Sequence, residues 1–269
     1  MKKGIRGHDV QAVGLENIAD RCREVGINYL QLVLEKSIDG FNAGNFSEEY
    51  ANEIKDSLGG MKIAVLGSYI NPSSVDKEGL EHGLLCFKEK IRYATVLNPI
   101  VVGTETGAYI EGQTDSEEAY QYLLKNIREL LAEAEKYNVN IGIEGVHIFV
   151  INTPQKMARL MGDLDSDNAR VIFDPINLIS IENYKEQNKI INDMFELLSD
   201  KLAVIHAKDF VVEDGRIKTV APGEGMLNYE LIFKNLKEHN LDIPVIVEEF
   251  NENKAVTAFE YLEKIRRNA

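Results

Sequence analysis

The chain has 269 residues, of which 44% are hydrophobic, and this suits one compact domain with a sizeable core. Its 44 acidic residues outnumber its 30 basic residues, and the net charge of −14 argues against a nucleic-acid-binding surface, because such surfaces concentrate positive charge. No apolar stretch reaches membrane-spanning length, and residues 1–7 lack the apolar core of a secretion signal. We therefore expect a cytoplasmic protein that binds neither nucleic acid nor membrane.

Segments of strand and helix character alternate along the chain. We expect eight strands, at residues 4–8, 29–33, 62–69, 99–103, 140–144, 171–174, 202–206 and 243–248. The helices expected between and after them cover residues 15–25, 47–58, 81–97, 116–137, 154–161, 190–198, 229–238 and 255–265. This order predicts an α/β fold, a (β/α)8 TIM barrel that forms a single domain of residues 1–269. An open doubly wound sheet is the alternative, but the sequence lacks the G-x-G-x-x-G turn expected of it.

One segment interrupts the alternation. Residues 212–228, after the seventh strand, are polar and carry glycines, and Asp214-Gly215 is a turn signal. We expect a small hairpin or loop over one end of the barrel, where it would form part of a lid.

The two cysteines, Cys22 and Cys86, lie in segments of helical character and do not form a C-x-x-C motif. This spacing disfavours a disulfide framework or a thiolate zinc site. We interpret both cysteines as core thiols.

Four of the expected strands end in a side chain that can bind a metal ion. Glu144 ends the fifth strand, Asp174 the sixth, His206 the seventh and Glu248 the eighth. Because alternate side chains of a strand share a face, inward orientation would bring all four to the C-terminal mouth of the barrel, where barrel enzymes keep their active sites. Three carboxylates and one imidazole suit Mn²⁺, Mg²⁺ or Co²⁺, with Zn²⁺ as a further candidate. One such residue alone would be interpreted as a solvated loop residue, but four together favour a metal site.

The chain resembles the xylose isomerase-like TIM barrels of the sugar phosphate isomerase/epimerase superfamily, which includes tagatose 3-epimerases, hydroxypyruvate isomerases and inositol-pathway enzymes. The resemblance covers essentially the whole chain and rests on Glu144 in Ile-Glu-Gly, Asp174 in Phe-Asp-Pro, His206 in His-Ala-Lys-Asp, Glu248 in Val-Glu-Glu and the loop Pro222-Gly223-Glu224-Gly225. It implies one divalent metal ion held by Glu144, Asp174, His206 and Glu248, with the two glutamates also acting as catalytic proton-transfer groups. It also implies a homo-oligomer, either a dimer or a tetramer.

The chain departs from many epimerases of this family after the sixth strand, where their Asp-x-x-His is replaced by Asp174-Pro175-Ile176-Asn177. Asn177 can hydrogen-bond a substrate hydroxyl but cannot become a cation, so the ketohexose specificity of those enzymes does not transfer directly. His147 is a candidate to compensate. Its apolar neighbours, residues 148–151, suit a packed or backbone-bonded histidine equally well.

Lys208 is a further substrate-binding candidate, because alternation places it on the same face as His206. Its ammonium could bind a carboxylate, a phosphate or a developing enolate oxygen. The alternative is a structural ion pair with Asp209 or Glu249.

Three weaker substrate-binding candidates follow other strands. Glu105 comes after the fourth strand, Asn71 after the third, and His8 ends the first. Each has an alternative role, as a solvated loop residue for Glu105 and Asn71 and as a packed histidine for His8.

These residues favour a divalent-metal-dependent isomerase or epimerase of a small sugar, sugar phosphate or related polyhydroxy carbonyl compound. One glutamate would remove a proton from carbon and the other would return it, through an enediolate. A metal-dependent dehydratase or lyase on an inosose-type ketone would begin with the same proton abstraction and stays open. An apurinic-site endonuclease of this superfamily is disfavoured, because five histidines and a charge of −14 do not suit a histidine-rich three-zinc site. The ligand set also argues against a barrel that binds a sugar without turnover.

Overall fold

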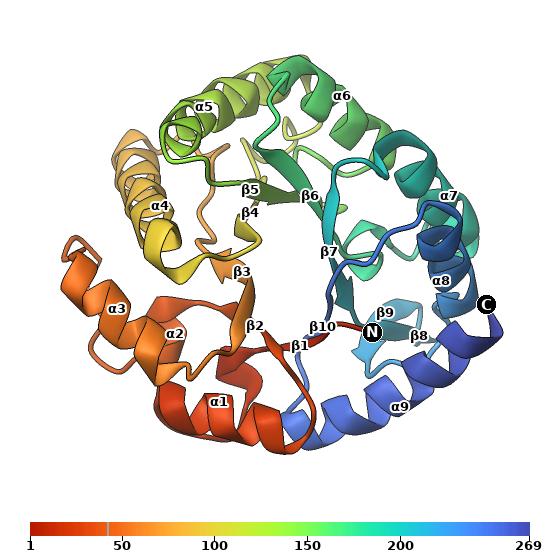
Figure 1. Ribbon diagram of the computed structural model, residues 1–269. Coiled ribbons are helices and arrows are strands. Elements are labelled where there is room, and N and C mark those ends of the chain that lie inside the picture. Colours follow the sequence, from red (N-terminus) through yellow and green to blue (C-terminus); the bar gives the residue numbers. More distant parts are fainter. Residues whose placement is uncertain (42) are drawn as a thin grey trace.

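The computed structural model describes residues 1–41 and 43–269, and within them the chain forms a closed barrel of eight parallel strands (Figure 1). Around the barrel the order is β1-β10-β7-β6-β5-β4-β3-β2. The strands are β1 (Lys3–Arg6), β2 (Tyr29–Leu32), β3 (Lys62–Gly67), β4 (Val101–Glu105), β5 (Ile141–Glu144), β6 (Ala169–Phe173), β7 (Leu202–Ala207) and β10 (Val245–Val247). The prediction of a single-domain TIM barrel is confirmed.

Helices surround the barrel as an outer layer (Figure 1). They are α1 (Leu15–Glu24), α2 (Leu34–Ser37), α3 (Glu48–Ser57), α4 (Lys77–Leu97), α5 (Glu117–Lys136), α6 (Pro154–Leu164), α7 (Gln187–Leu198), α8 (Tyr229–Glu238) and α9 (Glu252–Asn268). Several begin at a residue suited to the position: the side chains of Ser47, Ser116 and Thr153 each accept a hydrogen bond from the backbone N–H three residues later. None of the described helices has the length and apolarity required to cross a lipid bilayer.

Two short elements differ from the expected ones. The first strand ends at Arg6, and Gly7–Asp9 form a 3₁₀ turn (η1) that contains His8. The short helix α2, directly after β2, was not expected, because four residues are too few to show helical periodicity. Both elements lie at the end of the barrel where the strands finish.

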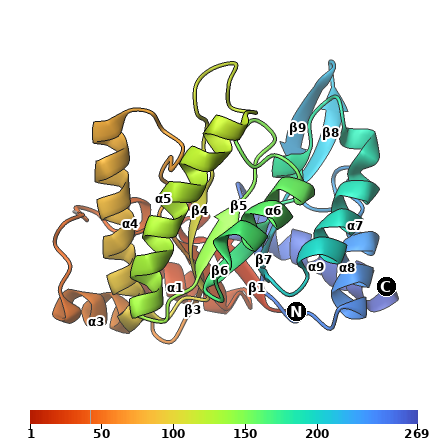
Figure 2. The same ribbon diagram turned by 90° about the horizontal axis from the view of Figure 1, so that it is seen from above.

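A hairpin stands above this same end of the barrel (Figure 2). Its antiparallel strands are β8 (Asp209–Glu213) and β9 (Arg216–Val220). Asp214 and Gly215 form the turn with φ angles of 51° and 71°, the left-handed conformation that this tight turn requires. The expected hairpin is therefore present, and it begins three residues earlier than residue 212 because the strand follows β7 almost without a break.

The barrel interior has its own small apolar core, separate from the larger core between strands and helices. It contains Tyr29, Ala64, Val65, Val101, Ile172, Ala203, Val204 and Ile246. Glycines make room for it: a Cβ on Gly4 would lie 2.1 Å from Ile246, and one on Gly142 would lie 2.9 Å from Ile172. Since Ile172, Val204 and Ile246 point inward, the residues two positions later follow them toward the barrel axis.

Cys22 is buried against the core as expected, but Cys86 on α4 is only partly buried. Its sulfur lies 3.5 Å from His82 Nε2, one helical turn earlier on an outward part of the helix. Within the described residues neither cysteine forms a disulfide.

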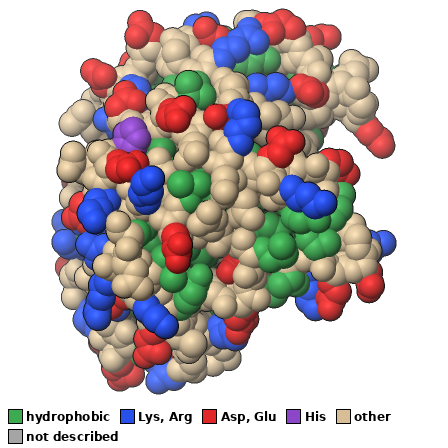
Figure 3. Space-filling view, turned by 90° about the vertical axis from the view of Figure 1, so that its right-hand side faces the viewer, with side chains coloured by type: hydrophobic (Ala, Val, Ile, Leu, Met, Phe, Trp, Pro, Cys, Tyr) green, Lys and Arg blue, Asp and Glu red, His purple; other side chains and the backbone are tan. Residues whose placement is uncertain are grey.

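Charges of both signs are mixed on the face of the molecule that lies at the right-hand side of Figure 1. Figure 3 shows Lys and Arg side chains interspersed with Asp and Glu there, beside a cluster of apolar side chains at one edge. On this face the excess acidic charge is therefore distributed and does not form one patch.

A buried carboxylate joins the two ends of the chain. Glu252, in the first turn of α9, is 0% exposed. Its Oε2 accepts a hydrogen bond of 2.9 Å from the Gln11 backbone N–H, and its Oε1 accepts one of 3.0 Å from Arg21 Nε. Although burial alone would raise the pKa of Glu252, these hydrogen bonds lower it. The ionised carboxylate therefore closes the outer layer between α1 and α9.

We expect Glu252→Gln to lower the free energy of unfolding by about 1–3 kcal/mol, because the charged hydrogen bonds of a buried group are weakened. Because the folded pKa is depressed, the stabilisation by the wild-type carboxylate is present above its ordinary pKa and is lost as the pH falls through the folded value. Urea unfolding at pH 7 and at pH 4 measures both effects. Exposed Glu16, replaced by Gln, is the matched control. An equal loss in both variants at pH 7 would show that the contacts of Glu252 contribute nothing specific.

Candidate active site

A cavity of about 320 Å³ opens at the C-terminal ends of the barrel strands. It is lined by Arg6, His8, Gln31, Val33, Lys36, Tyr69, Glu105, Glu144, Asn177, Lys208, Glu248 and Glu249. Larger hollows of about 630 and 450 Å³ lie near the strand starts Lys62 and Val245. We place the candidate site in the smaller cavity, because buried titratable groups converge there and barrel enzymes react at this end.

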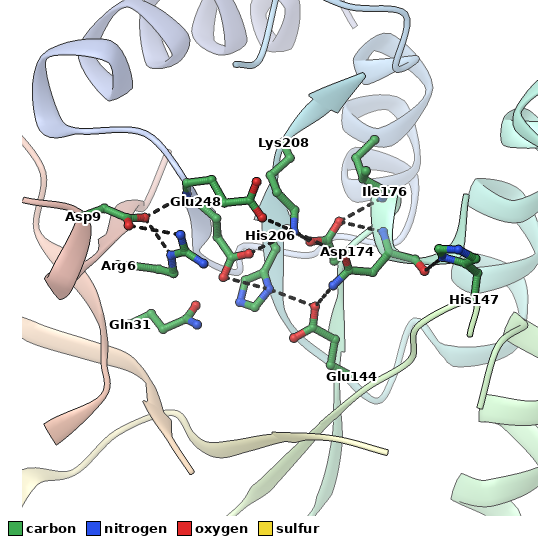
Figure 4. A network of polar contacts seen from close by, with 12 residues as sticks. Arg6, Asp9, Gln31, Glu144, His147, Asp174, Ile176, His206, Lys208 and Glu248 are labelled. Atoms are coloured by element: carbon green, nitrogen blue, oxygen red, sulfur yellow. Dashed lines mark hydrogen bonds and ion pairs between the residues drawn. The ribbon is translucent and has the colours of Figure 1, made fainter. Parts of the chain in front are cut away.

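Three of the expected ligands form a compact group beside this cavity (Figure 4). Glu144 ends β5, Asp174 follows β6 and His206 lies in β7, and one ligand atom of each lies within 4.8 Å of the other two. Their residues are 2%, 1% and 1% exposed. A buried group of two carboxylates and an imidazole is a set that could hold a divalent ion.

Glu248 lies beside this group, against His206. Its Oε1 is 3.4 Å from His206 Nδ1, and Oε1 of Glu144 is 3.2 Å from the same nitrogen. The two glutamates therefore flank one edge of the imidazole (Figure 4). Glu248 is not a member of the three-residue group, so its part as a fourth ligand stays a prediction.

Two buried polar atoms of the group lack hydrogen-bond partners among the described residues, namely Asp174 Oδ2 and His206 Nε2. The other carboxylate oxygen of Asp174 accepts hydrogen bonds from the backbone N–H groups of Ile176 and Asn177. This leaves Oδ2 directed at the cationic Lys208, whose Nζ is 2.8 Å away. Asp174 is thus already paired with one cation, and the site fits a further, divalent cation because donor atoms of Glu144, Asp174 and His206 lie within 4.8 Å of one another.

Lys208 is 5% exposed and lies among the carboxylates. Its Nζ is 3.3 Å from Glu248 and 3.4 Å from Glu249, in addition to its contact with Asp174. Burial would lower the pKa of this ammonium, but Asp174 and Glu248 raise it well above its ordinary value. Lys208 is therefore a permanent positive charge in the cavity.

Asp209, the other expected partner of Lys208, has a different role. Its buried carboxylate accepts hydrogen bonds from the backbone N–H groups of Phe210, Gly223, Gly225 and Leu227. It thereby ties the loop after the hairpin to the end of β7. The lysine itself is held by its backbone, whose carbonyl accepts a hydrogen bond of 2.6 Å from the Tyr229 hydroxyl.

The titrating groups of the site influence one another strongly. Burial lowers the pKa of His206, but Glu248 and Glu144 overcome this and raise it to about 9. Burial raises the pKa of Glu144, and its proximity to His206 only partly offsets this. Glu248 differs: burial would raise its pKa, but His206, Lys208 and Arg6 lower it. The pKa shifts of the two glutamates are therefore opposite in direction.

Asn177 bridges two of these groups. Its Nδ2 donates a hydrogen bond of 2.6 Å to Glu144 Oε1, and its Oδ1 accepts one of 3.3 Å from Lys208 Nζ. The amide thus orients Glu144 and also lines the cavity. Substrate binding by Asn177 stays a prediction.

The loop candidates divide into two groups. His8 and Glu105 line the cavity, as does Lys208. Asn71 and His147 are exposed and do not line it. Asn71 hydrogen-bonds the backbone of Ala108 and Ser73, and both the backbone N–H and Nδ1 of His147 contact the carbonyl of Asn177. The polar groups of these two residues hold loops together, and their expected contacts with substrate stay predictions.

Glu105 adds another carboxyl group to the cavity. It ends β4, with its Cα paired in register with that of Glu144 on the neighbouring strand. Burial, followed by the negative charges of Glu144 and Glu248, raises the pKa of Glu105 to about 7. At neutral pH this side chain can therefore donate a proton.

Sequence reasoning missed Arg6 and Asp9. Arg6 ends β1 and donates two hydrogen bonds to Asp9, of 2.7 and 3.0 Å. The same aspartate accepts a hydrogen bond of 2.8 Å from the backbone N–H of Glu249, which has a φ of 68° and is therefore in the left-handed region. Asp9 thus fixes both Arg6 and the turn directly after Glu248. The sequence did contain a signal for Arg6, because residues two positions apart on a strand share a face and Arg6 therefore shares one with Gly4 and His8.

Sequence reasoning also missed Gln31 and Tyr69, which line the cavity from β2 and from the end of β3. Gln31 was visible as the one polar side chain in the apolar run of residues 29–33. Tyr69 gave no such signal, because a tyrosine is common in a buried strand.

Comparisons with known proteins agree with this geometry. A model of the family described as xylose isomerase-like TIM barrel matches residues 19–266. An inosose dehydratase of Clostridium beijerinckii is 22% identical over 269 residues, covering 88% of this chain and 87% of the relative.

Solved structures share the fold. A D-tagatose 3-epimerase-like protein superposes with a TM-score of 0.80 at 21% identity, covering 100% of this chain and 98% of that one. The IOLI protein, described with a bound zinc atom, superposes with a TM-score of 0.76 at 18% identity, covering 100% of this chain and 97% of the other. The family match extends over nearly the whole barrel and includes the strand ends that carry Glu144, Asp174, His206 and Glu248, whereas β1 with Arg6 lies before it. The chain therefore belongs to the xylose isomerase-like TIM barrel family.

Proposed function

We propose that the chain is a divalent-metal-dependent isomerase or epimerase of a small sugar, sugar phosphate or related polyhydroxy carbonyl compound. The observation that carries the proposal is the buried group of Glu144, Asp174 and His206 with Glu248 beside it, which brings two carboxylates, Glu144 and Glu248, to one edge of the imidazole at a candidate cation site. This is the arrangement needed to remove a proton from one position of a bound substrate and return it at another.

The candidate ion is held by Glu144, Asp174 and His206, with Glu248 as the proposed fourth ligand. A bound divalent cation, proposed as Mn²⁺, Mg²⁺, Co²⁺ or Zn²⁺, would supply Lewis-acid chemistry by polarising the substrate carbonyl. The zinc described for the IOLI protein, which shares this fold, supports the binding of a metal ion. Asp174 would contribute Oδ2, which also lies 2.8 Å from Lys208 Nζ.

The remaining steps belong to side chains of this chain. One glutamate, in its ionised form, takes a proton from the carbon next to the carbonyl, giving an enediolate, and the other, in its protonated form, donates its own proton to the enediolate. Lys208, with its fixed positive charge, neutralises negative charge on a substrate oxygen. Asn177 keeps Glu144 in place through its hydrogen bond of 2.6 Å.

A metal-dependent dehydratase acting on an inosose-type ketone is the second candidate. The match to an inosose dehydratase supports it, and so does Glu105, whose pKa of about 7 suits an acid that protonates a departing hydroxyl. An epimerase has no leaving group and does not need this acid. The homo-oligomer and the cytoplasmic location stay predictions.

We expect the protein to bind about one Mn²⁺ per chain and to melt at a lower temperature after chelation, because an ion that binds only the folded state stabilises it. Asp174→Ala and His206→Ala should each abolish binding, since each removes a donor from the buried group. Elemental analysis after desalting measures the stoichiometry. Glu249→Ala is the control, since Glu249 lines the same cavity outside that group. If both variants still bind one Mn²⁺ per chain, neither Asp174 nor His206 is a ligand of the ion.

The affinity for Mn²⁺ should increase with pH. The pKa of His206 is raised to about 9, and its imidazole must lose that proton before it can bind a metal. One proton released per ion corresponds to a dissociation constant that falls up to about tenfold for each pH unit between pH 6.5 and 8.5. Titration calorimetry in buffers of different ionisation enthalpy counts the protons, and a pH-independent affinity would exclude His206 as a ligand.

Glu144→Gln and Glu248→Gln should each lower turnover by at least about 100-fold, because glutamine retains an oxygen donor but cannot act as a base. The assay is incorporation of deuterium from the solvent into keto-sugars, inosose-type ketones and hydroxypyruvate, followed by mass spectrometry. A variant that lacks only the returning acid exchanges the substrate proton without forming product, whereas loss of the abstracting base stops both.

The same assay separates the two candidate reactions. Glu105→Gln should leave epimerisation nearly unchanged but reduce dehydration, since only dehydration requires protonation of a leaving hydroxyl. Near wild-type turnover in both the Glu144 and the Glu248 variants would contradict the two-glutamate mechanism.

A further inference from the structure

The wall of the cavity opposite the metal-binding group contains an unusual buried amide. Gln31 lies in β2, is 2% exposed and lines the cavity. Glutamine is seldom buried this deeply unless its polar atoms are paired. Its Oε1 has no hydrogen-bond partner among the described residues. In Figure 4 the Gln31 amide lies near Arg6, across His206 from Asp174 and Lys208, and no contact joins it to another labelled side chain.

The local backbone aims Gln31 at the cavity. The pairing of β2 with β3 shifts register between Leu30 and Gln31, so that Leu30 pairs with Ile63 and Gln31 with Val65. Such irregularities redirect a side chain and recur next to active sites. The apolar residues on either side of Gln31, Leu30 and Leu32, are fully buried in the core, so the amide is a polar exception in an apolar strand.

Tyr69 completes the polar surface of this wall. Gln31 Nε2 donates a hydrogen bond of 2.6 Å to the Tyr69 hydroxyl. The hydroxyl oxygen is thus used as an acceptor, and its own proton is available to a ligand. The ring lies directly over Gly67, where a Cβ would be 2.8 Å from it, so a glycine permits this ring position. The pair therefore offers one acceptor, Gln31 Oε1, and one donor, the Tyr69 hydroxyl.

Positive charge at this wall is partly engaged: Arg6 is paired, whereas Lys36, which also lines the cavity, is exposed. The guanidinium of Arg6 makes two hydrogen bonds to the Asp9 carboxylate. A phosphate or carboxylate placed here would bring negative charge to the carbonyl oxygen of Gln31 and to a cavity that already contains Glu105 and Glu144. A hydroxyl group suits the wall better, because it can donate to Gln31 and accept from Tyr69 at the same time.

We propose that Gln31 and Tyr69 form a subsite for a neutral hydroxyl of the substrate, at the end away from the metal-binding group. The inference rests on the proposed function and narrows its substrate class to polyols and ketoses that are unphosphorylated at that end. Residues at β2 and β3 would select the substrate, and residues at the ends of β5, β6, β7 and β10 would carry out the proton transfer. A site built to hydrogen-bond a hydroxyl rejects analogues that lack it, because its buried polar atoms are then left unpaired.

The test uses two variants that retain shape. Gln31→Met removes the amide at similar volume, and Tyr69→Phe removes only the hydroxyl oxygen. Tyr137→Phe is the matched control, since Tyr137 follows α5 at the other end of the barrel and is 43% exposed. The probes are a ketohexose exchanged by the wild type, its terminal deoxy and terminal phosphate analogues, and an unreactive hexitol whose binding is followed by calorimetry.

We expect both variants to raise KM for the ketohexose, and Kd for the hexitol, by roughly tenfold or about 1.4 kcal/mol, the scale of one lost hydrogen bond. The kcat and the Mn²⁺ stoichiometry should change little. A general structural defect would instead lower both of them. The wild type should bind the deoxy and phosphate analogues at least about tenfold more weakly, and Gln31→Met should show a smaller difference between ketohexose and deoxy analogue.

The outcomes separate this inference from the proposed function. Unchanged KM and Kd in both variants, a phosphate analogue that binds as tightly as the free sugar, or a wild type that binds no hexitol would each overturn the subsite. Loss of hexitol binding in the variants without any proton exchange in the wild type would support the subsite and refute the isomerase.

Discussion

The candidate site depends on one electrostatic constraint, the burial of several carboxylates around a single imidazole. Glu144, Asp174 and Glu248 are at most 5% exposed and lie around His206. Like charges removed from water repel one another and are costly unless positive charge or hydrogen-bond donors accompany them. Lys208 supplies one such charge, 2.8 Å from Asp174, and the proposed divalent ion would supply more. The site is thus stable only as a complete set.

The barrel meets this constraint by placing the charged groups at the ends of rigid strands and fixing their backbones from outside. The Tyr229 hydroxyl holds the carbonyl of Lys208, and Asp209 beside it binds backbone N–H groups of the loop that follows the hairpin. On the other side Asp9 binds the N–H of Glu249. Neighbours of this kind determine side-chain positions to within the tolerance that proton transfer requires.

The two sides of the cavity differ in chemistry. The proposed proton-transfer and cation-binding groups lie at the ends of β5, β6, β7 and β10, whereas Arg6, Gln31 and Tyr69 lie at the ends of β1 to β3. A barrel allows this division, because its active-site residues come from the ends of several different strands. A D-tagatose 3-epimerase-like protein and an inosose dehydratase both resemble this chain, which agrees with a fold that can carry different chemistry.

The sequence by itself determined the barrel and the four residues at the ends of its last four strands, because apolar runs and period-two alternation are local properties of the chain. Only the tertiary structure decided which loop residues reach the cavity. Asn71 and His147 follow strands just as Glu105 does, yet their polar groups are engaged by distant loop backbone. The unpaired oxygen of Gln31 could likewise not be foreseen. Whether a polar atom has a partner depends on side chains from remote segments, and their positions follow from the packing of the whole barrel.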